Sequence, residues 1–283
     1  MLNQKVLVSG ADYFALDAPI NPYYDDKPVN VPQAVNDHSA IMAAFAKAGI
    51  TTVPVAPPKD SQDGVYTANW ALVYGNKAII SRLPDARKAE ESYAEKILSD
   101  YGFEIIKVPN DWHFSGQGDA LICGDLLLAG QGYRSDTHAQ QFAADALGLN
   151  LVQLQTIPKL DQSGQPITNP ASGWPDSYFY DIDLALSILR NDLIAYCPEA
   201  FDQESCAKIE SLPMSKITVS YDEAVKSFAC NLVSTGETVI MSANAPKLQR
   251  DIERYGLTTI TPEVAELPRG GGYIRCVSLN LAA

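Results

Sequence analysis

The sequence lacks the features of secreted, metal-stabilised and membrane-spanning chains. Its five cysteines are an odd number, are widely spaced and include no CxxC pair, so neither a disulfide framework nor a zinc site is indicated. No apolar run reaches about 18 residues, and no charged segment followed by a long apolar one marks a signal peptide. No Rossmann or P-loop glycine pattern occurs. We therefore expect a cytoplasmic chain with no membrane partner, no metal and no cofactor.

Basic residues are scarce as well. The chain has 21 Lys and Arg against 34 Asp and Glu, a formal net charge of −13. Such a charge opposes binding to nucleic acid and to anionic membranes, and it favours cationic small molecules if the acids line a pocket. An acidic surface alone would only keep the protein soluble.

A helix, a strand and a hairpin recur along the chain. The expected helices cover Val31 to Gly49, Glu90 to Tyr101, Thr137 to Leu147, Asp202 to Leu212 and Ala245 to Tyr255. The expected strands include Lys5 to Ser9, Ala71 to Tyr74, Ala120 to Cys123, Tyr178 to Leu189, Ala229 to Val233 and a last strand with Cys276. About five such units, roughly 50 to 70 residues apart, predict a closed, pseudo-symmetric α/β structure that forms a single domain over residues 1–283.

Three glycines, Gly270 to Gly272, precede the short β-like run that carries Cys276. Glycine permits positive φ and a close approach of backbone to ligand, so this loop is suited to presenting a nucleophilic thiol. The polar turns of the other units would converge with Cys276 on one pocket. The tail alone favours the alternative that Cys276 is a small buried side chain of a core strand.

Several segments share order and spacing with a known family. They are Gly10 to Phe14 with Ile20 to Pro22, Asp63 to Asn69, Ser81-Arg82, Gly130 to Arg134, Phe228 to Asn231 and Gly270 to Leu279. On these segments the chain resembles the guanidine-modifying, or pentein, superfamily over essentially its whole length. That family includes arginine deiminase, arginine dihydrolase, dimethylarginine dimethylaminohydrolase and the glycine amidinotransferases. The resemblance implies a five-bladed α/β propeller and favours a reactive Cys276.

The resemblance also implies roles for individual residues. Cys276 aligns with the nucleophile that attacks a guanidinium carbon, and the expected ligand is a small cationic guanidino or amino-acid substrate. The substrate-binding candidates are Asp63, Asp183, Asn69, Arg82, Arg134 and Asp119. Two fixed carboxylates, Asp63 and Asp183, can orient a planar guanidinium by charge-assisted hydrogen bonds, and the bound cation would lower the pKa of the thiol. Arg82 and Arg134 resemble side chains that hold a substrate carboxylate.

Two substitutions separate this chain from the family pattern. Asp181 stands where the family's F-Y-H-L-D motif has its general acid/base histidine, and Ser115 replaces the acid that orients that histidine. Loss of both suggests a repurposed or silenced site. Asp181 remains a candidate acid/base because burial beside other acids raises a carboxyl pKa. His113 is a second candidate, since on a strand it would share a face with Ser115.

A further departure is the connection from 158 to 176, which contains Trp174 and is longer than the family's usual link. We expect an insertion here, either a lid that changes substrate choice or an ordinary surface loop.

Three functions remain open. The chain is a hydrolase-like enzyme of the amidinohydrolase or amidinotransferase type that acts on C–N bonds of arginine or a related guanidino or amidino compound. Alternatively, it is a silenced family member that binds a cationic ligand as a sensor or interaction module, or it performs altered chemistry that needs no histidine. A homodimer is left open.

Overall fold

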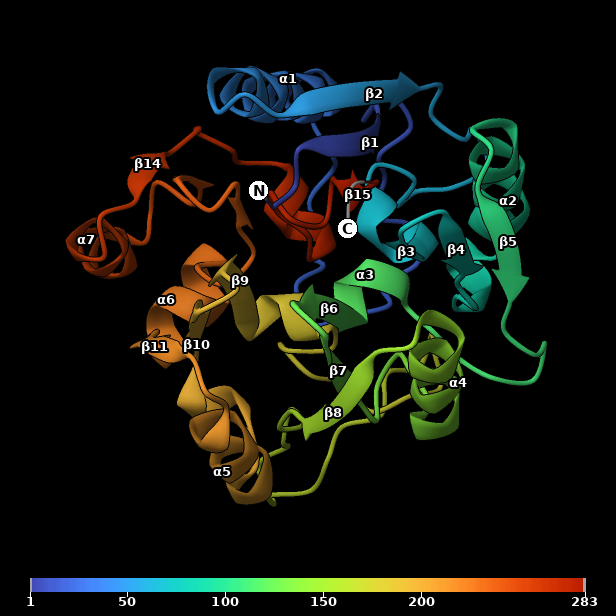
Figure 1. Ribbon diagram of the computed structural model, residues 1–283. Coiled ribbons are helices and arrows are strands. Elements are labelled where there is room, and N and C mark those ends of the chain that lie inside the picture. Colours follow the sequence, from blue (N-terminus) through green and yellow to red (C-terminus); the bar gives the residue numbers. More distant parts are fainter. Residues whose placement is uncertain (1, 282–283) are drawn as a thin grey trace.

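The computed structural model describes residues 2–281 and arranges five three-stranded sheets around a common centre (Figure 1). Their orders are β15-β1-β2, β3-β4-β5, β6-β7-β8, β9-β10-β11 and β12-β13-β14. In every sheet the middle strand pairs antiparallel with the inner strand and parallel with the outer one. The predicted five-bladed α/β propeller is therefore confirmed.

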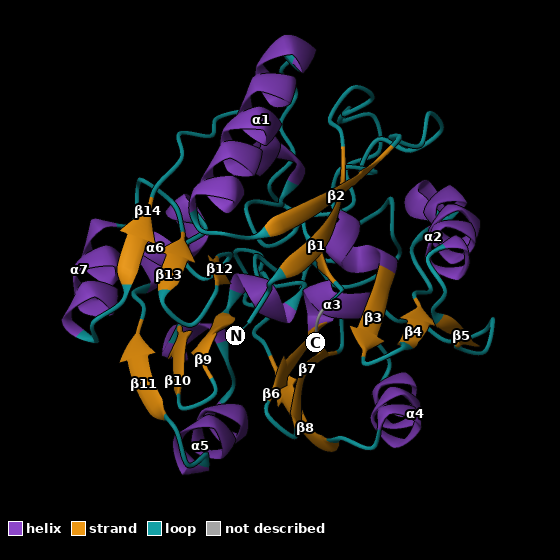
Figure 2. Ribbon diagram, turned by 45° about the horizontal axis from the view of Figure 1, so that its top comes forward, coloured by secondary structure: helices purple, strands orange, loops and turns teal. Residues whose placement is uncertain are grey.

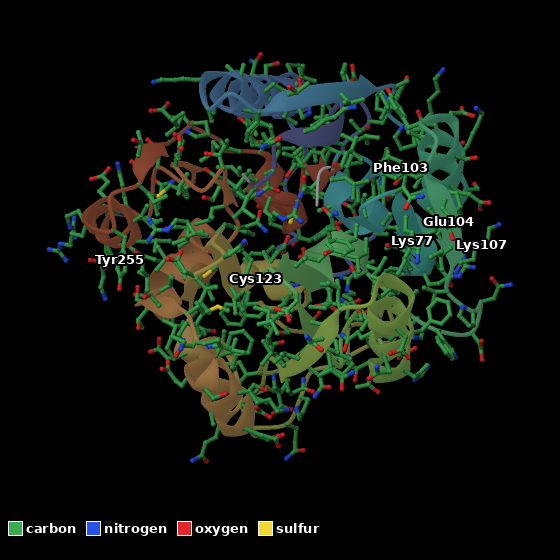
Figure 3. All side chains as sticks on the ribbon, viewed as in Figure 1. Lys77, Phe103, Glu104, Lys107, Cys123 and Tyr255 are labelled. Atoms are coloured by element: carbon green, nitrogen blue, oxygen red, sulfur yellow. The ribbon has the colours of Figure 1, made fainter. Side chains whose placement is uncertain are left out.

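The strands are short and regularly placed. They are β1 (Lys5–Ser9), β2 (Thr51–Val55), β3 (Ala71–Tyr74), β4 (Lys77–Ile80), β5 (Glu104–Lys107), β6 (Ala120–Cys123), β7 (Leu126–Gln131), β8 (Asn150–Gln155), β9 (Leu186–Arg190), β10 (Leu193–Tyr196), β11 (Ser215–Thr218), β12 (Val233–Ser234), β13 (Thr238–Ile240), β14 (Thr258–Ile260) and β15 (Leu279–Asn280). Figure 3 shows Cys123 of β6 near the centre and Lys107 of β5 on the rim.

A parallel strand pair needs a crossover, and in each unit a helix supplies it. The helices are α1 (Val31–Lys47), α2 (Ala89–Asp100), α3 (Gly116–Asp119), α4 (Thr137–Leu147), α5 (Gln203–Ser211), α6 (Tyr221–Ser227) and α7 (Pro246–Arg254). The crossover helices α1, α2, α4, α5 and α7 lie on the outside of the ring, which leaves the inner strands facing the centre (Figure 2). No helix within residues 2–281 is long and apolar enough to span a membrane.

The ring closes where β15 pairs with β1, in the register Val6 with Asn280 and Leu7 with Leu279. The first and last described strands thus belong to one sheet. Residues 158–176 contain no helix or regular strand, and two isolated bridges, Leu160 with Pro166 and Thr168 with Pro175, shape this loop. A single domain over residues 1–283, with an insertion at 158–176, stays a prediction.

Three expected strands are wrong in part. Residues 178–185 form turns and the 3-10 helix η3 (Ile182–Leu184) before β9 begins, because the Asp119 carboxylate accepts a hydrogen bond from the Ile182 amide in place of a strand partner. Residues 229–232 are turns that follow α6, a helix that the sequence pattern did not predict. Cys276 lies in a turn ahead of β15, because the Asn231 side chain takes up the amides of Arg275 and Cys276.

Candidate active site

Cys276 lines a cavity of about 10 Å³, enough for one water molecule. Asp63, Asn69 and Arg134 line the same cavity, so the structure brings together four of the predicted site residues. Ile20 also lines it, and Tyr24 of the same N-terminal loop, residues 10–30, donates a hydrogen bond to Asp63. We call residues 10–30 the covering segment. A cavity of this size holds no ligand larger than a water molecule, so a larger ligand needs the cavity to widen.

The Cys276 sulfur contacts two polar side chains. The Asn231 Nδ2 donates a hydrogen bond to it at 3.1 Å, and the thiol donates to the Asp183 Oδ2 at 3.4 Å. Burial and, after it, the neighbouring Asp183 raise the pKa of the Cys276 thiol well above its usual value. In the unliganded site the sulfur is therefore a thiol, and a cation bound beside it would oppose both effects.

Asp63 is buried and accepts hydrogen bonds from the N-terminal segment. The Tyr24 hydroxyl lies 2.9 and 2.8 Å from its two carboxylate oxygens, and Gln62 Nε2 lies 3.4 Å from one of them. Burial raises the pKa of Asp63 to about 6, against the opposing charge of Arg87. Tyr24 thus occupies the carboxylate that a guanidinium would need.

Asn69 connects the cavity wall to the substituted pair. Its Nδ2 donates to the Asp181 Oδ2 at 2.7 Å and to the Ser115 Oγ at 2.9 Å, while its Oδ1 accepts from Arg87 at 2.9 Å. A side chain at Gly118 would place its Cβ 2.3 Å from the Asn69 Nδ2, so glycine is required for this approach. Asp181 and Ser115 therefore lie together, one residue behind the cavity lining.

Three carboxyl groups, those of Asp119, Asp181 and Asp183, form a buried cluster that we call the acidic cluster. Each is at most 2% exposed, and each has one oxygen without a hydrogen-bond partner among the described residues. Burial raises the pKa of all three; Asp181 raises those of the other two further, and Arg134 opposes the shift at Asp181. Like charges buried together disfavour joint ionisation, so the raised pKa values favour a proton held within the cluster. Within residues 2–281 no group of three or more His, Cys, Asp and Glu side chains is placed to hold a metal.

The structure does not bring Arg82 to the cavity. Its guanidinium donates to Glu91 at 2.9 Å and to the Val108 carbonyl at 2.8 Å. Arg87 lines the cavity instead, buried and 2.7 Å from Glu90. Sequence reasoning missed Arg87. It ends a 3-10 turn just before α2, and its i,i+3 spacing from Glu90 in the first turn of α2 was the available signal for an ion pair.

His113 also lies outside the cavity lining. Its side chain is 45% exposed, its Nδ1 lies 3.3 Å from Asp136, and its ring packs edge-on against Trp174 at 4.5 Å. The expectation that His113 and Ser115 share a strand is wrong, because neither residue is in a strand and only Phe114 between them makes a bridge, with Arg82. His113 therefore cannot reach the thiol in this conformation.

Asp183, Arg275 and Gln117 line a second, larger cavity of about 270 Å³. Asp183 does not line the first cavity, but its carboxylate accepts a hydrogen bond from Cys276, which does. The walls of the larger cavity are mostly apolar side chains of β3, β6 and β9. Volume alone would favour this cavity as the active site. We assign the smaller one, because Cys276, Asp63 and Arg134 line it and none of them lines the larger one.

No family model matches the sequence. The chain is 28% identical, over 98% of its length, to the bifunctional arginine dihydrolase/ornithine cyclodeaminase AgrE of Nostoc sp., and it spans only 38% of that protein. It is 29% identical, over 95% of its length, to the N(G),N(G)-dimethylarginine dimethylaminohydrolase of Mycobacterium tuberculosis and covers 83% of that protein.

Solved structures show the same relationship. The N-terminal domain of ArgZ, a cyanobacterial arginine dihydrolase bound to substrate, superimposes with a TM-score of 0.88 at 27% identity, and the match covers 98% of both chains. A dimethylarginine dimethylaminohydrolase from Pseudomonas aeruginosa shares the fold, with a TM-score of 0.75 at 16% identity over 99% of each chain. In its five-sheet ring, in the order of its motifs and in these relatives, the chain is similar to the guanidine-modifying, or pentein, superfamily.

Proposed function

We propose that the chain binds a small guanidino or amidino compound at Asp63 and cleaves one of its C–N bonds by attack of Cys276. The observation that carries the proposal is the placement of the Cys276 thiol, in hydrogen-bond contact with Asp183, in the same cavity as the Asp63 carboxylate. The names of the relatives, arginine dihydrolase and dimethylarginine dimethylaminohydrolase, support the same class of substrate.

The reaction would begin when the cation replaces the Tyr24 hydroxyl at Asp63. The thiol proton passes to the Asp183 Oδ2, 3.4 Å away, and the thiolate forms a bond to the guanidinium carbon. The tetrahedral adduct then expels an amine, which takes up a proton from the acidic cluster. Water or an acceptor amine then forms a bond to the thio-linked carbon and gives a proton back to the acidic cluster. The C–S bond breaks, the product leaves, and the thiolate takes back its proton from Asp183.

In this scheme Asp181 performs the proton transfers that the family assigns to histidine. The Asn69 Nδ2 donates a hydrogen bond to the Asp181 Oδ2. The Asp181 Oδ1 has no partner among the described residues and is therefore available to a proton. Buried carboxyl groups with raised pKa values serve as general acids near neutral pH. The role of Asp181 rests on this geometry.

A second candidate is a binding module without turnover. It is favoured by one observation: no histidine lines the cavity, and both members of the family's proton-transfer pair are replaced, by Asp181 and Ser115. This candidate predicts ligand binding that does not depend on the Cys276 sulfur.

The two candidates are separated by incubating the protein with arginine, methylarginines, agmatine and smaller guanidines, and following products and Cys276 adducts by mass spectrometry. We expect turnover of at least one compound, no product or adduct with Cys276→Ala, and unchanged turnover with Cys230→Ala, a matched control at another buried cysteine. Binding detected by a raised melting temperature, with every compound recovered intact, would favour the binding module.

The pKa of Asp63 gives this binding a pH dependence. A cation prefers the ionised carboxylate, and Asp63 takes up a proton as the pH falls through about 6. We therefore expect the dissociation constant of a permanently charged guanidine to be constant above pH 7 and to increase about tenfold per pH unit below 6. Isothermal titration calorimetry between pH 5 and 8 tests this. A constant affinity across that range would show that Asp63 does not hold the cation.

A further inference from the structure

Arg134 lines the cavity as a buried cation without an ion-pair partner. It is 5% exposed, and among the described residues no carboxylate lies within ion-pair distance of it. Arg87, the other cavity arginine, has Glu90 at 2.7 Å. A buried charge is unfavourable unless it is paired. The charge of Arg134 acts on Asp181, but its guanidinium makes no direct ion pair among the described residues, so it can still pair with an anionic group on the ligand.

Two aromatic rings and one carbonyl hold the Arg134 guanidinium in place. Its central carbon lies 4.6 Å from the ring centre of Tyr180 and 5.7 Å from that of Trp174, and its NH2 donates to the Ile20 carbonyl at 2.7 Å. Aromatic rings attract a guanidinium while leaving its N–H groups available to an acceptor.

Trp174 comes from the 158–176 loop, and the structure fixes it from several sides. Its carbonyl accepts from the Asn169 amide at 2.7 Å, and the Asn169 side chain donates to the Pro19 carbonyl at 3.0 Å, next to Ile20 in the covering segment. On another side the His113 ring packs against Trp174 at 4.5 Å. His113, which lies outside the cavity, thus supports the ring that contacts Arg134.

We propose that Trp174 is a positioning residue: it holds the Arg134 guanidinium for a carboxylate of the ligand, so that the 158–176 loop sets the preference for ligands that carry one. The inference rests on the proposed cavity and extends it to the end of the ligand remote from Cys276. It also accounts for the position of His113, which the reaction does not use.

The test measures binding in a Cys276→Ser background, where no turnover occurs, for two pairs of compounds that differ in a carboxylate. The pairs are arginine with agmatine and norvaline with butylamine. We expect Trp174→Leu to weaken the binding of arginine about tenfold and that of agmatine less than twofold, and Trp174→Phe to restore most of the loss. The control Trp112→Ala removes a ring that packs on His138 at 4.3 Å and leaves both affinities unchanged.

Each outcome decides. Equal weakening of arginine and agmatine by Trp174→Leu, or no preference for arginine in the Cys276→Ser protein, would overturn the positioning role. If norvaline binds better than butylamine and loses that preference in Trp174→Leu while neither guanidine binds, the positioning role stands and the guanidine function falls. If no compound binds, both fall. Circular dichroism and melting temperatures show whether each variant is folded. If Trp174→Leu is not folded, the affinities of Trp174→Phe are compared with those of the Cys276→Ser parent, and that comparison decides.

Discussion

The double substitution of Asp181→His and Ser115→Glu is expected to raise the turnover of a guanidino substrate about 10²- to 10⁴-fold, the usual contribution of a well-placed general acid/base. The two side chains share one donor, Asn69 Nδ2, at 2.7 and 2.9 Å, so replacements at these positions begin as neighbours. An imidazole with a pKa near 6.5 exchanges protons at neutral pH more readily than an ordinary carboxyl group. Steady-state kinetics on the best compound of the panel measures the gain.

Single variants control this result. Asp181→His alone is expected to gain less, because no acid orients the ring, and Ser115→Glu alone is expected to gain nothing, because it adds a further carboxyl group beside Asp181. Asp181→Asn replaces the titratable carboxyl group by an amide, and it is expected to lower turnover because the natural chain then lacks its proposed acid/base. If the double variant binds arginine like the natural chain and turns over no faster, proton transfer at this position does not limit the reaction.

The second large effect concerns stability. We expect Arg87→Met to lower the free energy of unfolding by about 3–5 kcal/mol, the usual result of removing one partner of a buried ion pair. Arg87 and Glu90 lie 2.7 Å apart with side chains 6% and 0% exposed, so the substitution leaves the Glu90 charge buried and uncompensated. It also removes the hydrogen bond that orients Asn69, and with it the support of Asp181. Chemical denaturation monitored by tryptophan fluorescence measures the loss.

The matched control is Arg254→Met, because Arg254 pairs with Asp251 at the same i,i+3 spacing but is 74% exposed. Its denaturation midpoint is expected to stay close to that of the natural chain, since exposed pairs contribute little. The double variant Arg87→Met, Glu90→Leu should regain part of the stability, because no unpaired charge remains. A loss with Arg87→Met no larger than with Arg254→Met would show that burial of the pair is unimportant.

The fold could be predicted from local patterns because each unit repeats the same local signals. A helix that ends at a glycine and then a strand, as in residues 137–154, identifies a crossover without knowledge of the rest of the chain. The resemblance then supplied Cys276, Asp63, Asn69 and Arg134, and the structure places all four on one cavity. Local patterns and motif order were sufficient for these features.

The remaining features depend on contacts between distant segments. The Asn231 side chain accepts a hydrogen bond from the Cys276 amide, 45 positions further along the chain. The Asp119 carboxylate accepts one from the Ile182 amide, 63 positions further along. No local sequence pattern indicates that a backbone amide will donate its hydrogen bond to a distant side-chain oxygen and not to a neighbouring strand. Arg87 lines the cavity in place of the predicted Arg82 for a similar reason. Glu91 and the Val108 carbonyl, which lie outside the motif, hold the Arg82 guanidinium.

The pairing of β15 with β1 has a consequence for how the site is assembled. The register joins Val6 to Asn280, nearly the whole described chain apart, and contacts of such separation are entropically the most demanding to form. Cys276 lies three positions before β15, so the proposed nucleophile sits beside the strand pair that joins the two ends of the described chain. We therefore expect a variant that weakens the pairing of β1 with β15 to disturb the position of Cys276 as well as the closure of the ring.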